Sequence, residues 1–199
     1  MTGALAASLE RLGQDLARAG VPWALIGGFA VSARAEPRFT RDVDVCVVVD
    51  SDQAAERLAL TLTGWGYSIL AAIDHEYRDR LAAIRLDSPL VGGVIADLLF
   101  ASSGVEDDIV EGSDLLEILP GLTVPVAQAA HLVVLKLLSR DASRPQDDMD
   151  LRSLRSVLTA DDESEALRLA ELVMARGYAR ERDLPTLLSV YLATGQSRG

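Results

Sequence analysis

Residues 23–49, WALIGGFAVSARAEPRFTRDVDVCVVV, contain the features around which the rest of the chain is organised. The apolar segment 23–26 reads as a strand that ends in Gly27-Gly28, and a short helix with small residues follows at Phe29–Ala35. The first N–H groups of a helix have no partner within that helix, so a glycine turn there suits phosphate oxygens. The stretch therefore predicts a strand, a phosphate-binding turn and a helix.

The second half of the stretch predicts another strand, Asp42–Val49, which carries two aspartates. Side chains alternate between the two faces of a strand, so Asp42 and Asp44 lie on the same face. Their Cα atoms are then roughly 6.5–7 Å apart. Two carboxylates at this spacing can share divalent cations, and magnesium prefers such oxygen ligands. A phosphate-binding turn beside this pair favours metal-assisted phosphoryl or nucleotidyl transfer.

A third aspartate occurs on a later predicted strand, Gly93–Phe100, with the sequence GVIADLLF. A carboxylate between apolar neighbours is unfavourable to bury unless it has a partner. Asp97 could form a salt bridge with an arginine, or it could be the third carboxylate of a metal site. Its occurrence together with the Asp42-x-Asp44 strand favours the metal site.

The composition restricts the possible classes of protein. The chain has 199 residues, 49% of them apolar, which is enough for one sizeable core or a core with a smaller appended part. No apolar run is long enough for a membrane span, and the N-terminal segment has no signal-peptide pattern. The net charge of −11 argues against broad nucleic-acid binding. With Cys46 as the single cysteine, an intrachain disulfide is impossible, so a cytoplasmic location is expected.

The order of the predicted elements indicates an α/β (α+β) fold, a small mixed sheet flanked by helices with a C-terminal helical bundle. We expect a core at 1–124 and a helical region at 125–199 that packs on it, with no clear strand in the second part. The predicted helices are 4–19, 29–35, 52–64, 105–112, 126–140, a helix that Ser143 and Gln146 begin as a capping box, 163–176 and 184–193. The predicted strands are 23–26, 42–49, 67–73, 81–86, 93–100 and a turn-rich strand region at 115–124.

Lys136, the only lysine of the chain, lies inside the apolar helical run HLVVLKLL. It could bind phosphates, or its stem could lie along the surface with its charge in water. Asp147 and Asp148 fall in the first turn of the next helix, where negative charge is favoured in any case. No Cys/His spacing predicts a zinc site, so His75 and His131 are expected to be structural or solvent-facing, and Cys46 to be a small packed thiol.

These motifs carry a family resemblance. GGFAVSAR…PRFTRDVDV followed by IADLLF resembles the DNA-polymerase-β-like nucleotidyltransferase superfamily. The later KLLSRDASRPQDDMDL resembles the Lys…Arg-Pro-x-Asp-x-x-Asp-Leu segment of the AbiEii/AbiGii-type toxin branch, which includes MenT-like tRNA nucleotidyltransferases. The resemblance covers roughly residues 23–154. Gln146 is a departure, because basic members carry Lys or Arg there.

The resemblance implies a role for each matching residue. Gly27 and Gly28 would hold the triphosphate through backbone N–H groups, and Lys136 would neutralise its phosphates. Asp147 or Asp150 would orient that lysine or the acceptor. Asp42 and Asp44 would ligate two magnesium ions. Asp97 would complete the metal site and help deprotonate the acceptor. Arg41 would contact the nucleotide.

The implied activity is magnesium-dependent transfer of a nucleoside monophosphate from an NTP to an acceptor hydroxyl. The toxin branch suggests tRNA as the acceptor and an antitoxin as a protein partner. An aminoglycoside-type antibiotic adenylyltransferase is a second hypothesis, because an acidic surface suits a cationic small molecule better than RNA. A non-catalytic nucleotide-binding or regulatory protein is a third.

Overall fold

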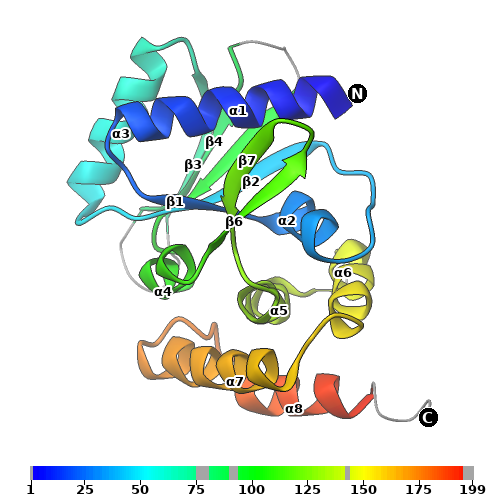
Figure 1. The fold of residues 1–199 in the computed structure, drawn as a ribbon. Coiled ribbons are helices and arrows are strands. Elements are labelled where there is room, and N and C mark those ends of the chain that lie inside the picture. The colour runs from blue at the N-terminus through cyan, green and yellow to red at the C-terminus, as the bar shows by residue number, and fades with distance from the viewer. Residues whose placement is uncertain (1, 75–80, 90–93, 142–143, 195–199) are drawn as a thin grey trace.

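The computed structural model describes residues 2–74, 81–89, 94–141 and 144–194, which fold around one mixed sheet (Figure 1). The strands are β1 (Trp23–Ile26), β2 (Asp42–Val47), β3 (Ser68–Asp74), β4 (Leu81–Asp87), β5 (Ile95–Leu99), β6 (Asp114–Leu119) and β7 (Leu122–Val126). The helices are α1 (Thr2–Arg18), α2 (Gly27–Arg34), α3 (Asp52–Gly64), α4 (Glu106–Glu111), α5 (Ala129–Ser139), α6 (Pro145–Arg155), α7 (Ala160–Ala175) and α8 (Leu184–Thr194).

The sheet has seven strands in the order β3-β4-β5-β2-β1-β7-β6. β2 lies in the middle, antiparallel to β1 and parallel to β5. β1 is in turn parallel to β7, while β4 is antiparallel to β5. The strand that precedes the glycine turn, β1, and the strands that carry the aspartates, β2 and β5, are therefore neighbours in the sheet, although residues 48–94 separate β2 from β5 in the chain.

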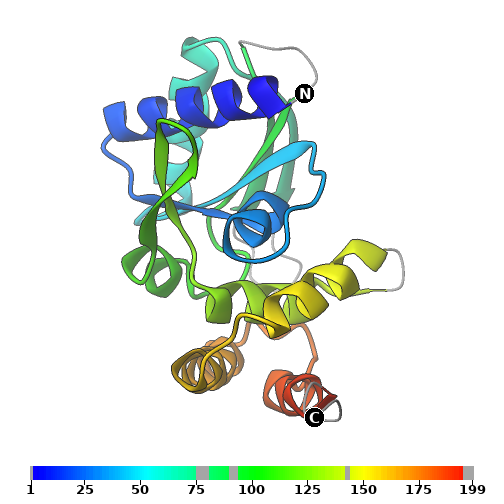
Figure 2. The same ribbon diagram turned by 45° about the vertical axis from the view of Figure 1, so that its right-hand side comes forward.

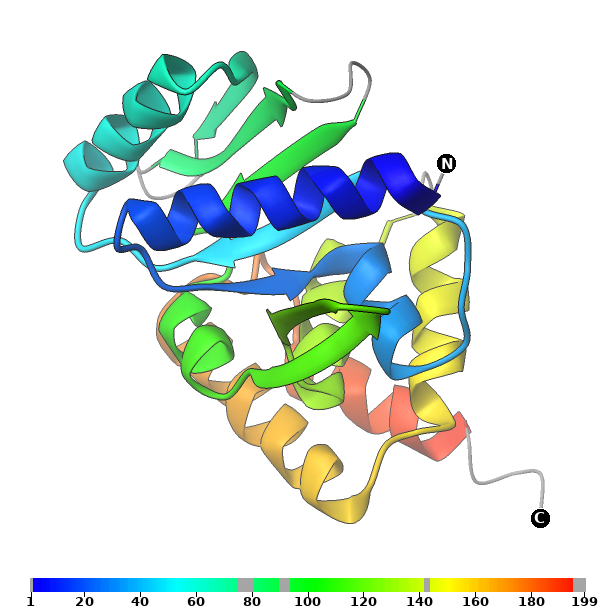
Figure 3. The same cartoon turned by 45° about the horizontal axis from the view of Figure 1, so that its top comes forward.

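Helices cover both faces of the sheet. Figure 1 and Figure 2 show α1 and α3 on one face, α2 and α5 on the other, and α7 and α8 as a further layer beyond α5. Figure 3 shows α1 lying across the face of the sheet that is opposite to α5. The leucines that predicted this helix face the sheet and are buried, namely Leu5, Leu9, Leu12 and Leu16. Their spacing of three and four residues forms the apolar stripe of an amphipathic helix.

The predicted fold class is confirmed, since helices flank a mixed sheet and further helices follow it. The prediction that no strand follows residue 124 is wrong. Pro125 and Val126 belong to β7, where Pro125 is paired with Leu115 and Val126 with Leu25 of β1. Because proline has no backbone N–H to donate, the local sequence predicts that a strand ends before residue 125. Pro125 is nevertheless paired with the preceding strand β6, and the next residue, Val126, with Leu25 of β1, which lies far earlier in the chain.

Helix boundaries also differ from the sequence prediction. α2 begins at Gly27, before the expected Phe29, and α5 begins at Ala129, after the expected Val126. α7 begins after Thr159, whose side chain forms a capping box with Asp162. The predicted cap at Ser143 and the turn that contains His75 lie outside the described residues.

Among the helices after β7, α5 is the central one. It contacts α2, which covers the sheet, and also α6, α7 and α8. α6 also contacts α2. The division into 1–124 and 125–199 remains a prediction. In the described part of the chain, none of the helices has the length and apolar character needed to cross a membrane.

Candidate active site

The register of the sheet brings Asp44 and Asp97 together. Asp44 of β2 lies directly opposite Asp97 of β5 in the parallel pair. Residues that are paired across neighbouring strands project to the same face. Asp44 is only partly buried, and both side chains line a cavity between the sheet and α5. The pairing of β2 with β5 therefore brings these two carboxylates together from separate strands, as expected.

Gly27 is in direct contact with Asp44. Its backbone has a φ of +65°, in the left-handed region that favours glycine, and a Cβ atom added here would overlap the Asp44 carboxylate. The next residue, Gly28, is the first buried residue of α2, and a Cβ atom there would overlap the Arg38 guanidinium. Gly27 is thus required by space and by its backbone, whereas a side chain at residue 28 would displace the Arg38 guanidinium, and the turn lies beside the aspartate strand. Ile26, the residue before α2, provides no side-chain cap for the first-turn amides.

Asp97 forms an ion pair that the sequence left as one of two alternatives. Arg85 of β4 lies opposite it in the antiparallel register. The Nε and one terminal nitrogen of Arg85 donate to the two oxygens of Asp97 at 2.8 and 2.7 Å. This bidentate contact raises the pKa of Arg85 above its already high value. In the arrangement seen, both oxygens of Asp97 are committed to an arginine.

Burial, and then the charge of Asp97, raise the pKa of Asp44 to about 6. Asp42 acts in the same direction, while Lys136 and Arg144 act against it. Burial and a neighbouring negative charge both disfavour the ionised form of a carboxyl. The pocket around Asp44 is therefore one in which an added cation would be favourable.

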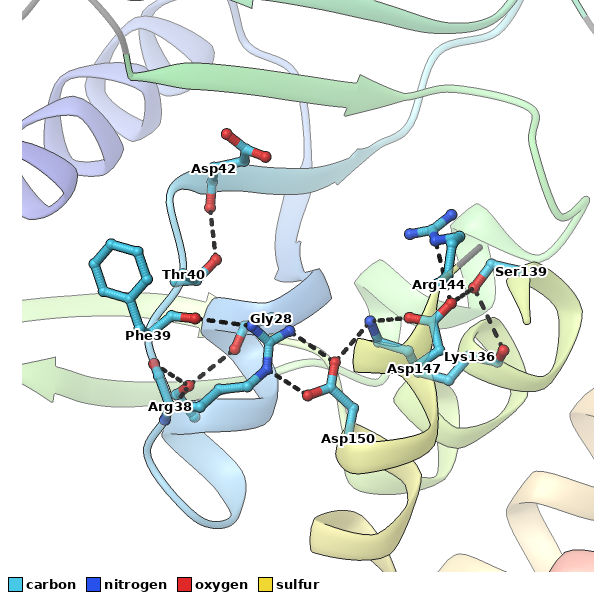
Figure 4. A network of polar contacts seen from close by, with 11 residues as sticks. Gly28, Arg38, Phe39, Thr40, Asp42, Lys136, Ser139, Arg144, Asp147 and Asp150 are labelled. Carbon is cyan, nitrogen blue, oxygen red and sulfur yellow. Dashed lines mark hydrogen bonds and ion pairs between the residues drawn. The ribbon is translucent and has the colours of Figure 1, made fainter. Parts of the chain in front are cut away.

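Lys136 is buried and bound by two aspartates of the next helix (Figure 4). Its Nζ lies 2.7 Å from Asp147 Oδ1 and 2.8 Å from Asp150 Oδ2. Asp147 also accepts a hydrogen bond from Ser139 at 3.1 Å, and Arg144 lies 3.2 Å from it. Both Asp147 and Asp150 thus contact the lysine, and both are 1% exposed. The surface position considered for Lys136 does not occur, because the side chain is 8% exposed.

Arg38 joins this cluster to the glycine turn, a link that the sequence analysis missed. Its terminal nitrogen donates to Asp150 Oδ2 at 2.8 Å, and Nε donates to the other oxygen (Figure 4). Burial favours the neutral form of Asp150, but hydrogen bonds from Arg38 and Lys136 outweigh it and lower its pKa. The only available sequence signal was the group of arginines around the aspartate strand, which does not distinguish Arg38 from its neighbours.

Two predicted site residues lie apart from this cluster. Asp42 is at the start of β2 and partly buried, and Figure 4 shows its carboxylate pointing away from Arg38. It does not line the cavity formed by the described residues. Arg41 is exposed, with its guanidinium 5.6 Å from the centre of the Phe39 ring. The structure therefore does not bring Arg41 to Lys136, and its predicted nucleotide contact remains untested.

The cavity has a volume of about 370 Å³. Its polar lining comes from the glycine turn, the sheet, α5 and the segments that follow β5 and precede α6 and α8, and includes Gly27, Asp44, Arg85, Asp97, Ser102, Lys136, Ser139, Arg144 and Arg180. Aliphatic side chains such as Leu99 of β5 and Leu132 of α5 form other parts of the wall. A pocket of this size with a few convergent charged groups is typical of a small-ligand site.

Two further predictions concern residues beside the site. Cys46 is buried, and burial raises the pKa of its thiol, which agrees with a packed thiol. His131 is also buried, and burial lowers its pKa, while Nε2 lies 3.3 Å from Glu165. The expectation of a structural or solvent-facing histidine is thus resolved in favour of the structural one. His75 lies outside the described residues.

The carboxylates suit a divalent cation in their chemistry. Asp42, Asp44 and Asp97 supply only oxygen ligands, and the pKa of Asp44 is raised by burial and by the charge of Asp97. As the side chains stand, however, the described residues contain no group of three or more acidic, histidine or cysteine side chains arranged to hold an ion. In this arrangement Asp97 is engaged by Arg85, and Asp42 does not line the cavity.

Residues 12–194 match the family described as the nucleotidyl transferase AbiEii toxin of type IV toxin–antitoxin systems. The chain belongs to the AbiEii family. It is accordingly a nucleotidyltransferase, and the family description favours this activity over the non-catalytic alternative. The search of curated proteins found no match.

Solved structures agree with the AbiEii assignment at the level of the fold. A nucleotidyltransferase-like antigenic protein from Paracoccidioides brasiliensis is 17% identical, with a TM-score of 0.55 over 93% of this chain and 92% of its own. The antibiotic-resistance factor ANT(2'')-Ia is 15% identical, with a TM-score of 0.54 over 98% of this chain and 96% of its own. Both likenesses show a shared nucleotidyltransferase fold.

Proposed function

We propose that this AbiEii-family chain transfers a nucleoside monophosphate from an NTP to an acceptor hydroxyl in the cavity between the sheet and α5. The observation that carries the proposal is the convergence of Gly27, Asp44 and Asp97 at this cavity, with Lys136 on its opposite side. These residues come from the turn, two strands and a helix, and an isolated structural carboxylate does not require such a combination.

In this proposal the backbone N–H groups at the start of α2 hold the triphosphate, and the ammonium of Lys136 balances its negative charge. Asp147 and Asp150 fix the position of the lysine, since both are within hydrogen-bond distance of Nζ. Arg38 holds Asp150 against the loop that follows α2. The nucleotide would then lie with its α-phosphate near Asp44. Arg41 remains a candidate nucleotide contact at the rim.

The proposed cofactor is magnesium, which Asp42, Asp44 and Asp97 would hold as carboxylate ligands. When bound there, two ions would activate the acceptor hydroxyl and stabilise the departing pyrophosphate. The acceptor oxygen forms a bond to the α-phosphorus, and the bond from that phosphorus to the bridging oxygen of pyrophosphate breaks. Asp97 assists in removing the proton of the hydroxyl.

For the acceptor we propose tRNA, and for the protein partner an antitoxin, because the family is described as the toxin of a toxin–antitoxin system. The cytoplasmic location expected from the sequence belongs to the same proposal. The test is to incubate the protein with each α-labelled NTP, magnesium and total RNA, and to follow label into RNA. We expect Asp44→Ala to reduce transfer by about a hundredfold or more, since metal ligation contributes several kcal/mol to such reactions.

A matched control is Asp50→Ala, which removes an exposed aspartate from the segment after β2. This variant should transfer label as the wild type does. Equal transfer by Asp44→Ala and the wild type would contradict the assignment of the active site.

A second candidate is adenylyl transfer to a cationic small molecule such as an aminoglycoside. The observation in its favour is the net charge of −11, which attracts cations and repels RNA. ANT(2'')-Ia, which shares the fold, is described as an antibiotic-resistance factor. Parallel reactions with RNA and with aminoglycosides, analysed for labelled products, separate the two: label on the small molecule alone would replace the tRNA proposal.

A further inference from the structure

One row of charged side chains crosses the face of the sheet that borders the cavity. Arg85 of β4 is paired with Asp97 of β5, and Asp97 is paired with Asp44 of β2. Cross-strand pairs place their side chains next to each other on one face. The row therefore has the order arginine, carboxylate, carboxylate over three adjacent strands, and its middle member has a charged neighbour on each side.

Both oxygens of the middle carboxylate, Asp97, accept a hydrogen bond from the arginine. Arg85 uses two nitrogens for the two oxygens of Asp97, at 2.8 and 2.7 Å. This fork-to-fork geometry directs the pair more strongly than a single contact does. The side chain of Arg85 is 47% exposed, whereas that of Asp97 is 16% exposed, so the arginine is the member of the pair that faces solvent more.

Three other positive side chains of the described residues line the cavity, and one of them, Arg180, donates a hydrogen bond to the backbone carbonyl of Ser102 at 3.1 Å. Lys136 is buried between Asp147 and Asp150. Arg144 is exposed and contacts Asp147. Among Arg85, Lys136 and Arg144, Arg85 is the one that forms an ion pair with a carboxylate of the row, and its side chain is partly exposed to solvent.

We propose that Arg85 is a positioning residue that holds Asp97 in the metal-free protein and is exchanged for the divalent cation when the site is loaded. The exchange requires only rotation of Arg85 away from Asp97, after which both oxygens of Asp97 face Asp44 and the cavity. Arg85 therefore competes with the cation, and weakening its bidentate contact tightens metal binding. This inference rests on the proposed metal site at Asp44 and Asp97.

The test measures Mn²⁺ binding to the nucleotide-free protein by isothermal titration calorimetry at pH 7.5, with circular dichroism as a check of folding. We expect Arg85→Ala to bind Mn²⁺ about fivefold more tightly than the wild type, the size expected for a partly exposed ion pair. Arg85→Lys keeps the charge but lacks the planar fork, so it should also bind more tightly than the wild type.

Two comparisons separate this exchange from a general effect of charge. Arg144→Ala removes a positive charge from the same cavity without touching Asp97, so it should tighten binding less than Arg85→Ala. The inference is overturned if Arg85→Lys binds as the wild type does, if Arg144→Ala matches Arg85→Ala, or if Arg85→Ala binds more weakly. Unchanged Mn²⁺ binding by Asp44→Ala would instead count against the metal site of the proposed function.

Discussion

Gly27 and Asp44 occupy adjoining space so closely that a Cβ atom on residue 27 would overlap the aspartate carboxylate. The glycine also has a φ of +65°, which an L-residue with a side chain adopts at a cost of roughly 1–2 kcal/mol. The turn and the carboxylate strand are therefore one structural unit. Any change to the first glycine of the pair must move the side chain proposed to bind metal.

We expect Gly27→Ala to lower the free energy of unfolding by about 2–4 kcal/mol, through backbone strain and displacement of Asp44. The matched control is Gly20→Ala. Gly20 has a φ of +69°, but its added Cβ would meet nothing within 4 Å, so only the backbone strain applies. Urea denaturation of both variants measures the difference. Equal losses of stability would show that the contact with Asp44 is unimportant.

The raised pKa of Asp44 predicts that protonation of this carboxylate stabilises the metal-free protein. The folded pKa of about 6 exceeds the unfolded value of 3.8, so the folded state binds the proton more tightly between these values. Its contribution to stability is present at low pH and is lost as pH rises through about 6. We expect Asp44→Asn to be more stable than the wild type by about 1–3 kcal/mol at pH 7.5.

Thermal or urea unfolding at pH 5 and 7.5 in the presence of a chelator tests this. The comparison of wild type with Asp44→Asn cancels the other titrating groups, including His131, whose lowered pKa acts in the opposite direction. The advantage of the variant should shrink at pH 5. An advantage of the same size at both pH values would mean that Asp44 titrates normally.

Lys136→Met should lower the free energy of unfolding by about 3–5 kcal/mol, because it leaves Asp147 and Asp150 buried with less positive charge. The double variant Lys136→Met/Asp147→Asn should recover part of this stability. If Lys136 also binds nucleotide, the double variant will still lack transfer activity. Recovery of activity together with stability would assign the lysine a purely structural role, and unfolding experiments combined with the labelled-NTP assay distinguish the two.

Arg38→Ala should destabilise the protein by about 1–3 kcal/mol, since it removes two hydrogen bonds to the buried Asp150. Arg41→Ala provides the comparison, because Arg41 is exposed and lies over Phe39. Its stability should remain within about 0.5 kcal/mol of the wild type. An increase of KM for NTP in Arg41→Ala alone would support the nucleotide contact predicted for Arg41.

Local patterns in the sequence were sufficient for most of the elements. The spacing of Leu5, Leu9, Leu12 and Leu16 identifies α1, and the alternation around Asp42 and Asp44 identifies β2. Such patterns fail where a distant partner decides the conformation. Val126 is extended because it pairs with Leu25 of β1, and nothing near it in the sequence indicates this partner.

The sequence by itself determined the types of group at the site: a glycine turn, a pair of aspartates on one strand face, a third aspartate and a single lysine. Only the tertiary structure decided how these groups are paired. Asp97 faces Arg85 because β4 is its neighbour in the sheet, and Arg38 reaches Asp150 across 112 residues of sequence. Alternation along a strand fixes the face on which a side chain lies, but the neighbouring strand, the register and the rotamer that join two charges arise only when the whole chain packs.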